Sequence, residues 1–506
     1  MVKHILAALL AGSALCEPVI AQDSAAGAAD AAPLTAEEVR ALRDEVRQLR
    51  REVAELRGEA AARHDSQAVP AEVPPRSADI AVVESAPAPS WKGAPQMSEK
   101  GGWSFKPKGT VQFDAGFVGT PGPERSGTVG GLNYNNLGWN ARARRLIIGA
   151  EGTMPGGFGY KAEFNFAQGT VDYEDIILSY QRPGSPIQVT VGNFYPLPSL
   201  ETMTSSRVTS FLERASLTDA FVYNRRLGLA VAYLGDDDLY SLTAGLWSAE
   251  INNTGFNRTG WQASARATYS PTMGSTKLHL GANVQHRVAQ RDAQNVQYRS
   301  RPFTQITDQR FVDTGLVAAD GDDIAGLELG AIHGPFHFAG EAQHSWVRAH
   351  RPGHAFGPNN GAAGGLFFNG DPAFTAGYVE IGYYLTGETR GYKGGKWDRT
   401  KVLKPFDNHG WGAIQLNARI DFLDLRDRVS GATLAAPDYV NGGRQIGYQL
   451  SLIWNPMDYV RFMAQYAHGA YSGGPRATTV DPTSTEPANS RGYSNDSMAV
   501  RAQVEF

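Results

Sequence analysis

Arginine residues gather in one stretch of the chain where they could bind anions. Four of them lie in or directly after residues 194–225: Arg207, Arg214, Arg225 and Arg226. The same stretch contains the spacing S-x-x-E, from Ser210 to Glu213, which is typical of a capping box at the start of a helix. Guanidinium groups and helix amino termini both favour carboxylate and phosphate oxygens, so we expect an anion site here.

The alternative interpretation gives these arginines a structural role only. Arg207 and Arg214 would then form ion pairs with Glu201 and Glu213 and fix the segment in place. The sequence leaves both interpretations open.

The remaining groupings of reactive side chains do not predict catalysis. A group of acidic residues offers oxygen ligands for calcium: Asp320, Asp322, Asp323 and Glu328. It lacks the spacing of an EF-hand, and a solvated acidic loop is the preferred interpretation. The histidines His333, His337 and His344 lack the H-E-x-x-H pattern, and we interpret them as strand and turn residues. We expect no cofactor and no metal site.

Enzymes and nucleic-acid partners are also disfavoured by the sequence. No nucleophile elbow, Walker loop or dinucleotide fingerprint occurs in it. The formal net charge of -4 gives no general attraction for nucleic acid or other anions, so any charge preference must be local. A hydrolase built on a β-barrel is the enzymatic alternative.

Strands must position these residues, because from Trp103 onward bulky apolar side chains alternate with polar or small ones. Short turns alternate with mostly longer connections, which predicts a transmembrane antiparallel β-barrel of about sixteen strands, an all-β fold, in which residues 194–225 form a long loop. Residues 387–410 are long where a turn is expected. We expect strands near 109–118, 142–152, 159–168, 174–182, 187–193, 226–235, 239–248, 261–270, 277–288, 325–333, 336–348, 376–386, 411–421, 445–455, 459–469 and 496–506.

The last strand carries the most specific local signal. Met498, Val500 and the terminal Phe506 share one face with the other apolar residues, and Arg501 and Glu505 lie on the opposite face. A strand of this kind that ends in an aromatic residue is the usual signal for outer-membrane assembly.

Residues before the barrel have three predicted parts. Residues 1–21 have the basic start, apolar run and small-residue site of a cleaved secretory signal. Lipid attachment at Cys16, the single cysteine, is disfavoured because Leu15 precedes it. Residues 34–58 carry Val and Leu in a heptad pattern, with Glu and Arg flanking, which predicts a parallel periplasmic coiled coil. Residues 59–102 are rich in Ala and Pro and are expected to be a tether.

The stretch 142–220 resembles the phosphate-selective porins O and P of bacterial outer membranes. ARARRLIIGAEGT, GYKAEFNFA, VTVGNFYPLPSLETMTSSRVTSFLERASL and the later YYLTGETRGYK carry the resemblance. It implies a sixteen-stranded trimer in which the third loop, residues 194–225 by the strand placement above, folds inward and narrows the pore. It also implies that Arg144 and Arg145 match an arginine pair that contributes to anion binding. Where phosphate-selective members carry a lysine and an arginine, this chain has Thr202 and Thr110.

Strand parity constrains the arginine pair. If Leu146 and Ile148 face lipid, Arg145 points into the lumen and Arg144 points outward. An arginine in the middle of the lipid face costs roughly 2 to 4 kcal/mol. Arg144 is therefore expected at the aqueous rim, or a bulge turns it inward.

The sequence predicts an outer-membrane porin for passive diffusion of small hydrophilic solutes with a preference for phosphate-like anions. The candidate constriction residues are Arg144, Arg145, Thr202, Arg207, Arg214 and Arg226. A homotrimer in the lipid bilayer is expected. The alternative is a general porin without phosphate selectivity that also serves as a structural tether.

Overall fold

The computed structural model of the chain describes residues 90–91, 95–99, 101–121, 137–248, 251, 260–290, 293–351, 365–427, 439–480 and 483–506. The predicted signal (1–21) and coiled coil (34–58) lie outside these residues, as does most of the predicted tether (59–102). Among the described residues, no helix is both long enough and apolar enough to cross a bilayer.

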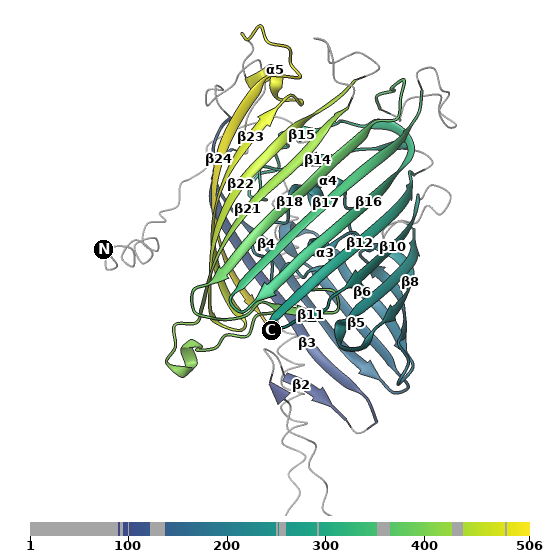
Figure 1. Cartoon of the computed structure of the whole chain (residues 1–506), viewed down its shortest axis with the longest axis vertical. Coiled ribbons are helices and arrows are strands. Elements are labelled where there is room, and N and C mark those ends of the chain that lie inside the picture. The colour runs from purple at the N-terminus through teal and green to yellow at the C-terminus, as the bar shows by residue number, and fades with distance from the viewer. Residues whose placement is uncertain are drawn as a thin grey trace, which may run out of the picture. The chain divides into compact units, whose positions relative to one another are not determined.

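Sixteen antiparallel strands of the described chain close into a barrel (Figure 1). Closure comes from the pairing of the last strand with the first, in the register that places Arg501 opposite Asp114. Each predicted strand corresponds to one of the sixteen, so the barrel prediction is confirmed. The strands are β3 (Ser104–Val118), β4 (Gly138–Met154), β5 (Phe158–Asn165), β6 (Asp172–Gln181), β7 (Ile187–Phe194), β8 (Arg226–Leu234), β9 (Tyr240–Trp247), β10 (Trp261–Tyr269), β12 (Thr276–Val288), β16 (Val317–His333), β17 (Phe336–Ala349), β18 (Ala373–Tyr384), β21 (Ala413–Asp427), β22 (Val440–Met457), β23 (Val460–Ser472) and β24 (Gly492–Glu505).

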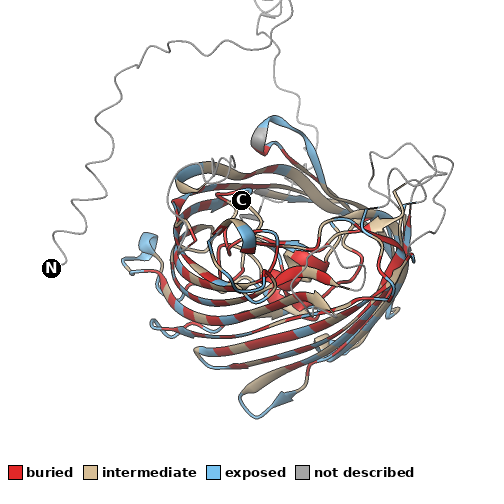
Figure 2. Ribbon diagram, turned by 90° about the horizontal axis from the view of Figure 1, so that it is seen from above, coloured by how far each residue is buried: buried red, intermediate tan, exposed pale blue. Residues whose placement is uncertain are grey.

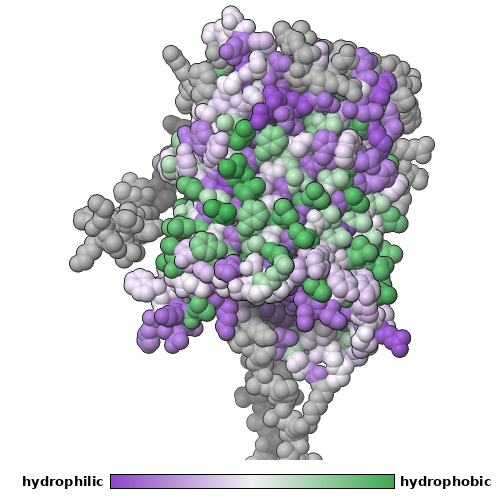
Figure 3. Space-filling view, viewed as in Figure 1, coloured by the Kyte–Doolittle hydropathy of each residue, from purple (hydrophilic) through white to green (hydrophobic). Residues whose placement is uncertain are grey.

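Alternation along the strands separates an apolar outside from a polar inside. In β24, Met498 is 58% exposed on the outer face, whereas Arg501 is 2% exposed on the inner face. The outward-facing apolar side chains form a band around the wall, with hydrophilic residues above and below it (Figure 3). This distribution suits a wall that crosses lipid and encloses polar side chains.

Three connections fold into the barrel, where the sequence predicted one. The predicted segment 194–225 supplies the first, as residues 195–225 between β7 and β8, with α3 (Leu200–Met203) and α4 (Ser216–Phe221). The second runs from β12 to β16 and carries β13 (Asn295–Val296), β14 (Arg299–Ser300) and β15 (Val312–Asp313). The third runs from β18 to β21 and carries the hairpin β19 (Gly391–Lys393) and β20 (Lys396–Asp398). From above, buried segments fill part of the ring of strands (Figure 2).

A hydrophobic core inside the barrel holds the three inward connections together. Phe221 of α4, Tyr298 beside β14 and Trp397 of β20 belong to one buried cluster with wall residues such as Phe374. Burial of such side chains is worth about 1.5 to 3 kcal/mol each. These connections are therefore packed elements of the barrel interior.

One local prediction is wrong. Ser210 and Glu213 do not start a helix, because α4 begins at Ser216. The Ser210 hydroxyl donates to Glu380 on the wall at 2.9 Å. The Glu213 carboxylate accepts hydrogen bonds from arginines of the wall. Neither side chain therefore caps the backbone. Near the end of the predicted tether, β1 (Ser90–Trp91) and β2 (Pro95–Ser98) pair with each other, and β2 pairs with β3.

The remaining described elements are short. They are β11 (Thr272–Met273), α5 (Ala477–Val480), η2 (Ala167–Gly169), η3 (Asp236–Asp238) and η4 (Phe406–Asn408).

Candidate functional site: an arginine-lined constriction

A polar cavity of about 690 Å³ lies between the first inward connection and the wall formed by β4 to β6. Ten basic and six acidic residues line it, so the cavity has an excess of positive charge in a chain whose formal net charge is -4. The basic residues are Arg144, Arg145, Lys161, Arg207, Arg214, Arg225, Arg299, Arg301, Arg310 and Lys396, and the acidic residues are Glu163, Asp172, Glu174, Asp175, Glu213 and Asp219.

A β-bulge in β4 turns both residues of the predicted arginine pair inward. Gln112 of β3 pairs with Arg145, and the next residue, Phe113, pairs with Ala143, so Arg144 is the extra residue. A bulge of this kind breaks the alternation of faces. Of the two predicted positions for Arg144, the bulge is the one observed, and both guanidinium groups line the cavity.

Arg144 ties the wall to the first inward connection. Its Nε and Nη2 donate to the two carboxylate oxygens of Glu213 at 2.7 and 2.9 Å, and Arg501 donates to the same carboxylate at 2.8 Å. Burial acts to raise the pKa of the Glu213 carboxyl, but Arg144 and Arg501 outweigh it and hold that pKa well below its usual range. The charge of Arg144 is therefore largely compensated.

Arg145 keeps its charge uncompensated. Its side chain is in the cavity wall, the residue is 8% exposed, and Nη1 donates to the neutral Gln112 Oε1 at 2.8 Å. No carboxylate of the described residues forms an ion pair with it. A buried cation without a counterion attracts a diffusing anion much more strongly than a paired one does.

Arg214 also lines the cavity without a carboxylate ion-pair partner among the described residues. It donates to the backbone oxygens of Glu201 and Thr204 at 3.0 and 2.7 Å, and it lies 5.8 Å from the centre of the Tyr195 ring. The ion pair with the Glu201 or Glu213 carboxylate, which the alternative interpretation required of Arg214, does not form in the described structure. The Glu201 carboxylate instead accepts from the amide of Ala215 at 2.7 Å.

Arg207 lines the cavity but is paired. Its Nη2 donates to Glu163 of β5 at 2.7 Å, and its Nε donates to the Thr110 hydroxyl. The predicted partners Glu201 and Glu213 lie in the same connection as Arg207, whereas the observed partner lies on the barrel wall. Arg207 therefore fixes the connection to the wall, and less of its charge is available to a solute.

The other two predicted positions differ in their access to the cavity. Arg226 is not among the residues that line it, because its side chain donates to the Ser248 oxygen at 2.9 Å and stacks on Tyr223 at 4.1 Å. Thr202 lines the cavity as a neutral residue, with its hydroxyl 3.1 Å from that of Thr218.

The cavity lining also includes Arg225, one of the four arginines expected at an anion site, and Lys396, which the sequence did not predict. Arg225 is paired with Glu174 and Asp175, and although burial acts to lower its pKa, the opposing charges of its neighbours raise it. Lys396 reaches the cavity from β20 and has no carboxylate ion-pair partner in the part of the chain that the structure describes. Burial, with the nearby charge of Lys161, lowers the pKa of Lys396. In the sequence, the hairpin was indicated by the length of residues 387–410, where a short turn was expected.

Charges on the rest of the inner wall are mostly compensated. Arg266 donates to Glu328 at 2.9 Å, and Arg501 donates to Asp114 at 2.6 Å. The acidic residues that were interpreted as a loop belong to β16: Asp320, Asp322, Asp323 and Glu328. That interpretation is wrong, because β16 pairs with β12 through Asp322, Asp323 and Glu328. Described His, Cys, Asp and Glu residues form no group that could hold a metal ion.

Known proteins are similar to this chain over most of its length. The family model "Phosphate-selective porin O and P" matches residues 129–506. An uncharacterized protein of Caulobacter vibrioides is 35% identical over 427 residues, which are 80% of this chain and 78% of that protein.

Solved channels have a similar barrel at low identity. The outer membrane channel DcaP of Acinetobacter baumannii is 14% identical, with 81% of this chain and 99% of that chain covered and a TM-score of 0.45. An anion-selective porin from Comamonas acidovorans is 12% identical, with 80% and 100% covered and a TM-score of 0.44. These values are too low for the solutes of those channels to inform on this one. The family match and the closed barrel agree, and this chain, an outer-membrane channel protein, belongs to the phosphate-selective porin O and P family.

Proposed function

We propose that this porin passes small hydrophilic solutes by diffusion and prefers anions, with phosphate-like anions among them. The observation that carries the proposal is the charge of the constriction. Its cavity is lined by ten basic and six acidic residues, and Arg145 and Arg214 have no carboxylate ion-pair partner among the described residues. An anion that enters meets these guanidinium groups where much of the surrounding water is displaced.

The arrangement suits conduction because no single contact is dominant. Arg145 approaches from the wall, Arg214 from the first inward connection and Lys396 from the β19–β20 hairpin. Guanidinium forks match the oxygens of phosphate or carboxylate, and a lysine acts as a point charge. Several weak sites in one cavity allow an anion to enter and also to leave.

The neutral residues of the constriction bear on whether the porin selects phosphate over other anions. Thr202 and Thr110 are neutral where phosphate-selective members are cationic, and the Thr110 hydroxyl accepts from Arg207. A porin that prefers anions in general therefore fits these residues better than one that accepts phosphate alone. The alternative remains a general small-solute porin with no phosphate selectivity.

Planar bilayers test the proposal directly. The reversal potential under a potassium chloride gradient at neutral pH is expected to show a larger chloride than potassium permeability. Phosphate added to the chloride solution is expected to reduce the chloride current if both anions share the constriction. A preference for potassium would overturn the anion part of the proposal, and an unchanged chloride current would leave the general porin as the better description.

The Arg145 and Arg214 positions are tested by the same measurement. Replacement of either by alanine is expected to lower the chloride preference, whereas replacement of Arg207, which is paired with Glu163, is expected to have less effect on selectivity. Equal effects of all three changes would mean that the total charge, and not the unpaired guanidinium groups, sets the preference.

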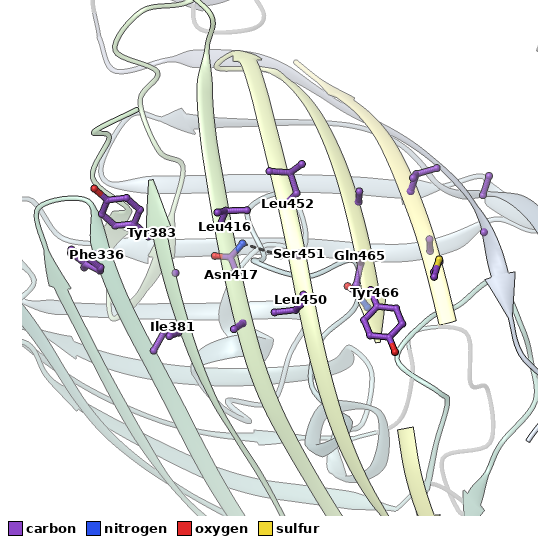
Figure 4. A pocket seen from close by; sticks show the side chains of 18 of the residues that line it. Phe336, Ile381, Tyr383, Leu416, Asn417, Leu450, Ser451, Leu452, Gln465 and Tyr466 are labelled. Atoms are coloured by element: carbon purple, nitrogen blue, oxygen red, sulfur yellow. Dashed lines mark hydrogen bonds between the residues drawn. The ribbon is translucent and has the colours of Figure 1, made fainter. Parts of the chain in front are cut away.

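We further propose a homotrimer. A shallow apolar hollow of about 830 Å³ crosses the outer wall from β18 to β3, where Ala115, Ala418 and Ala464 leave space between larger side chains (Figure 4). A wall with small residues can approach another wall closely. The short hydrophobic side chains there support contact with a second copy.

The residues before the barrel complete the proposal. Residues 1–21 act as a signal that is removed on export, and residues 34–58 form a parallel coiled coil joined by the tether 59–102 to the barrel, 103–506. The coiled coil links subunits on the periplasmic side or serves as a tether towards the cell wall. Deletion of residues 34–58 is expected to leave single-channel conductance unchanged, since the barrel and its inward connections supply the residues that line the cavity. Loss of conductance in that variant would argue against this role.

A further inference from the structure

The connection between β18 and β21 has a second surface that does not serve the constriction. Beyond the β19–β20 hairpin, residues 400–412, here called the foot, leave the barrel interior and project from the end of the barrel that has the short turns (Figure 1). The foot contains η4 and leads directly into the first residue of β21, Ala413.

Backbone hydrogen bonds make the foot a compact, closed turn. The amide of Gly412 donates to the oxygen of Lys404 at 2.9 Å, and the amide of Gly410 donates to the oxygen of Pro405 at 2.9 Å. Its start is fixed to the barrel, because the amide of Val402 donates to Asp458 at 2.8 Å. The surface of the foot is therefore held in a defined orientation.

The foot exposes three large apolar side chains. Trp411 is 78% exposed, Leu403 is 59% exposed and Phe406 is 46% exposed. These three residues alternate with polar ones: Lys401, Lys404, Asp407, Asn408 and His409 are all exposed. Hydrophilic residues gather on the side of the projecting foot that points away from the barrel, and apolar residues lie on the side nearer the wall (Figure 3).

An aromatic contact joins the foot to the membrane-facing wall. The ring of Phe406 lies 5.3 Å from that of Trp454 in β22, and Trp454 lies 5.4 Å from Phe462 in β23. The Trp454 indole donates to the Trp411 backbone oxygen at 2.8 Å. The apolar side of the foot is thus continuous with the apolar band of the barrel.

We propose that the foot is a membrane-interface anchor that lies on the periplasmic leaflet of the outer membrane. Leu403, Phe406 and Trp411 enter the boundary between headgroups and acyl chains, and Lys401 and Lys404 contact the phosphates of anionic phospholipids. Tryptophan and lysine are the residues that suit this depth, because each has an apolar body and a polar end. The anchor would fix the β18 to β21 connection, and with it the hairpin that carries Lys396.

A lipid occupant fits the foot better than a second copy of the chain. The proposed contact between copies uses a hollow with small side chains, whereas the foot presents large aromatic and aliphatic groups with lysines beside them. Tight protein interfaces are depleted in lysine, and interfacial membrane segments are enriched in it.

Depth-dependent fluorescence quenching tests the anchor in the full-length porin reconstituted into vesicles. The emission of Trp411 is obtained as the difference between wild type and Trp411→Phe. Phospholipids brominated near the headgroup end of the acyl chain are expected to quench this emission at least about threefold more than aqueous iodide does, as for an interfacial tryptophan. Trp397→Phe is the matched control, since Trp397 is buried inside the barrel and its emission should respond to neither quencher.

Each outcome of the quenching experiment either supports or overturns the proposed anchor. Strong quenching by iodide with none by brominated lipid would place Trp411 in water and overturn it. Protection from both quenchers would indicate a protein partner, such as a second copy, and would also overturn it. In the double variant Lys401→Gln and Lys404→Gln, quenching by brominated phosphatidylglycerol is expected to fall towards that seen with brominated phosphatidylcholine. Equal quenching by the two lipids in wild type would contradict the proposed contact of Lys401 and Lys404 with anionic phospholipids.

Discussion

At the scale of single residues, pairing separates the arginines that hold the constriction together from those that can attract a solute. Arg144 and Arg207 line the cavity, but each gives its guanidinium to a carboxylate, Glu213 or Glu163. Arg145 and Arg214 donate only to amide and carbonyl oxygens. The count of arginines in the sequence therefore overstates the charge that a passing anion meets.

We expect Arg145→Ala to lower the ratio of chloride to potassium permeability by about fivefold, because a unit charge about 4 Å from an ion is worth about 1 kcal/mol in water. Arg145→Lys should retain most of the preference, since it keeps the charge. The reversal potential in planar bilayers measures both. Arg182→Ala removes the same charge from an exposed turn and is the control. An equal loss in that control would show that the effect is not local.

Glu213 gives a prediction for pH. Because its pKa is held below the usual range, the ion pair with Arg144 stabilises the folded connection at every pH above the ordinary carboxyl value of about 4.3, and this contribution is lost only as the pH falls through the lowered pKa. Single-channel conductance should therefore stay constant from pH 7 to about pH 4.5.

The variant Glu213→Gln removes that anchor and frees the charge of Arg144. Loss of a hydrogen bond between charged groups costs about 1.5 to 3 kcal/mol. Because the first inward connection is then held less firmly, larger fluctuations of the single-channel current are expected. The freed charge of Arg144 should also strengthen the chloride preference. A quiet current with unchanged selectivity in this variant would contradict the role assigned to the pair.

At the scale of elements, the β19–β20 hairpin is the unexpected part of the constriction. The Arg266 guanidinium donates to the Gly395 oxygen at 2.8 Å, and Trp397 is buried against the first inward connection. These contacts hold Lys396 at the cavity, while Lys393 on the same hairpin is exposed elsewhere.

Lys396→Gln is expected to lower the chloride preference by about two- to fivefold with little change in conductance, because it removes a charge and keeps a similar volume. Lys393→Gln is the matched control, and it should leave the reversal potential as in wild type. If the two variants behave alike, the hairpin narrows the pore without contributing to selectivity.

At the scale of the whole molecule, the inner and outer surfaces of the barrel differ in polarity, and each has a proposed role. Its interior is a partly filled core beside a cationic passage, and its exterior is an apolar wall with the hollow from β18 to β3. Net charge describes neither surface, since the molecule as a whole is slightly acidic and the passage is basic.

The hollow predicts where a bulky residue disrupts the oligomer. Ala464→Trp fills the hollow and is expected to shift the porin in mild detergent from the trimer towards the monomer, as measured by light scattering. Leu329→Trp places the same side chain on β16, outside the hollow, and should leave the oligomer intact. A stable trimer in both variants would show that the subunits meet elsewhere.

The sequence by itself determined the barrel. Alternation of apolar and polar residues is a local pattern with a period of two, so the number of strands, their order and the inward face of most charged residues follow from reading along the chain. The resemblance in residues 142–220 was also available from the sequence, and it implied the first inward loop. What the alternation could not give was the bulge at Arg144, because one extra residue changes the face without changing the composition.

Only the tertiary structure decided which charges are free. Arg144 meets Glu213 across 69 positions of sequence, and Arg207 meets Glu163 across 44, so their partners depend on how the inward connections dock. The docking of the second and third connections rests on a buried cluster that no local pattern in the sequence identifies. A contact between distant residues is fixed by packing, and the availability of Arg145, Arg214 and Lys396 is a consequence of that packing.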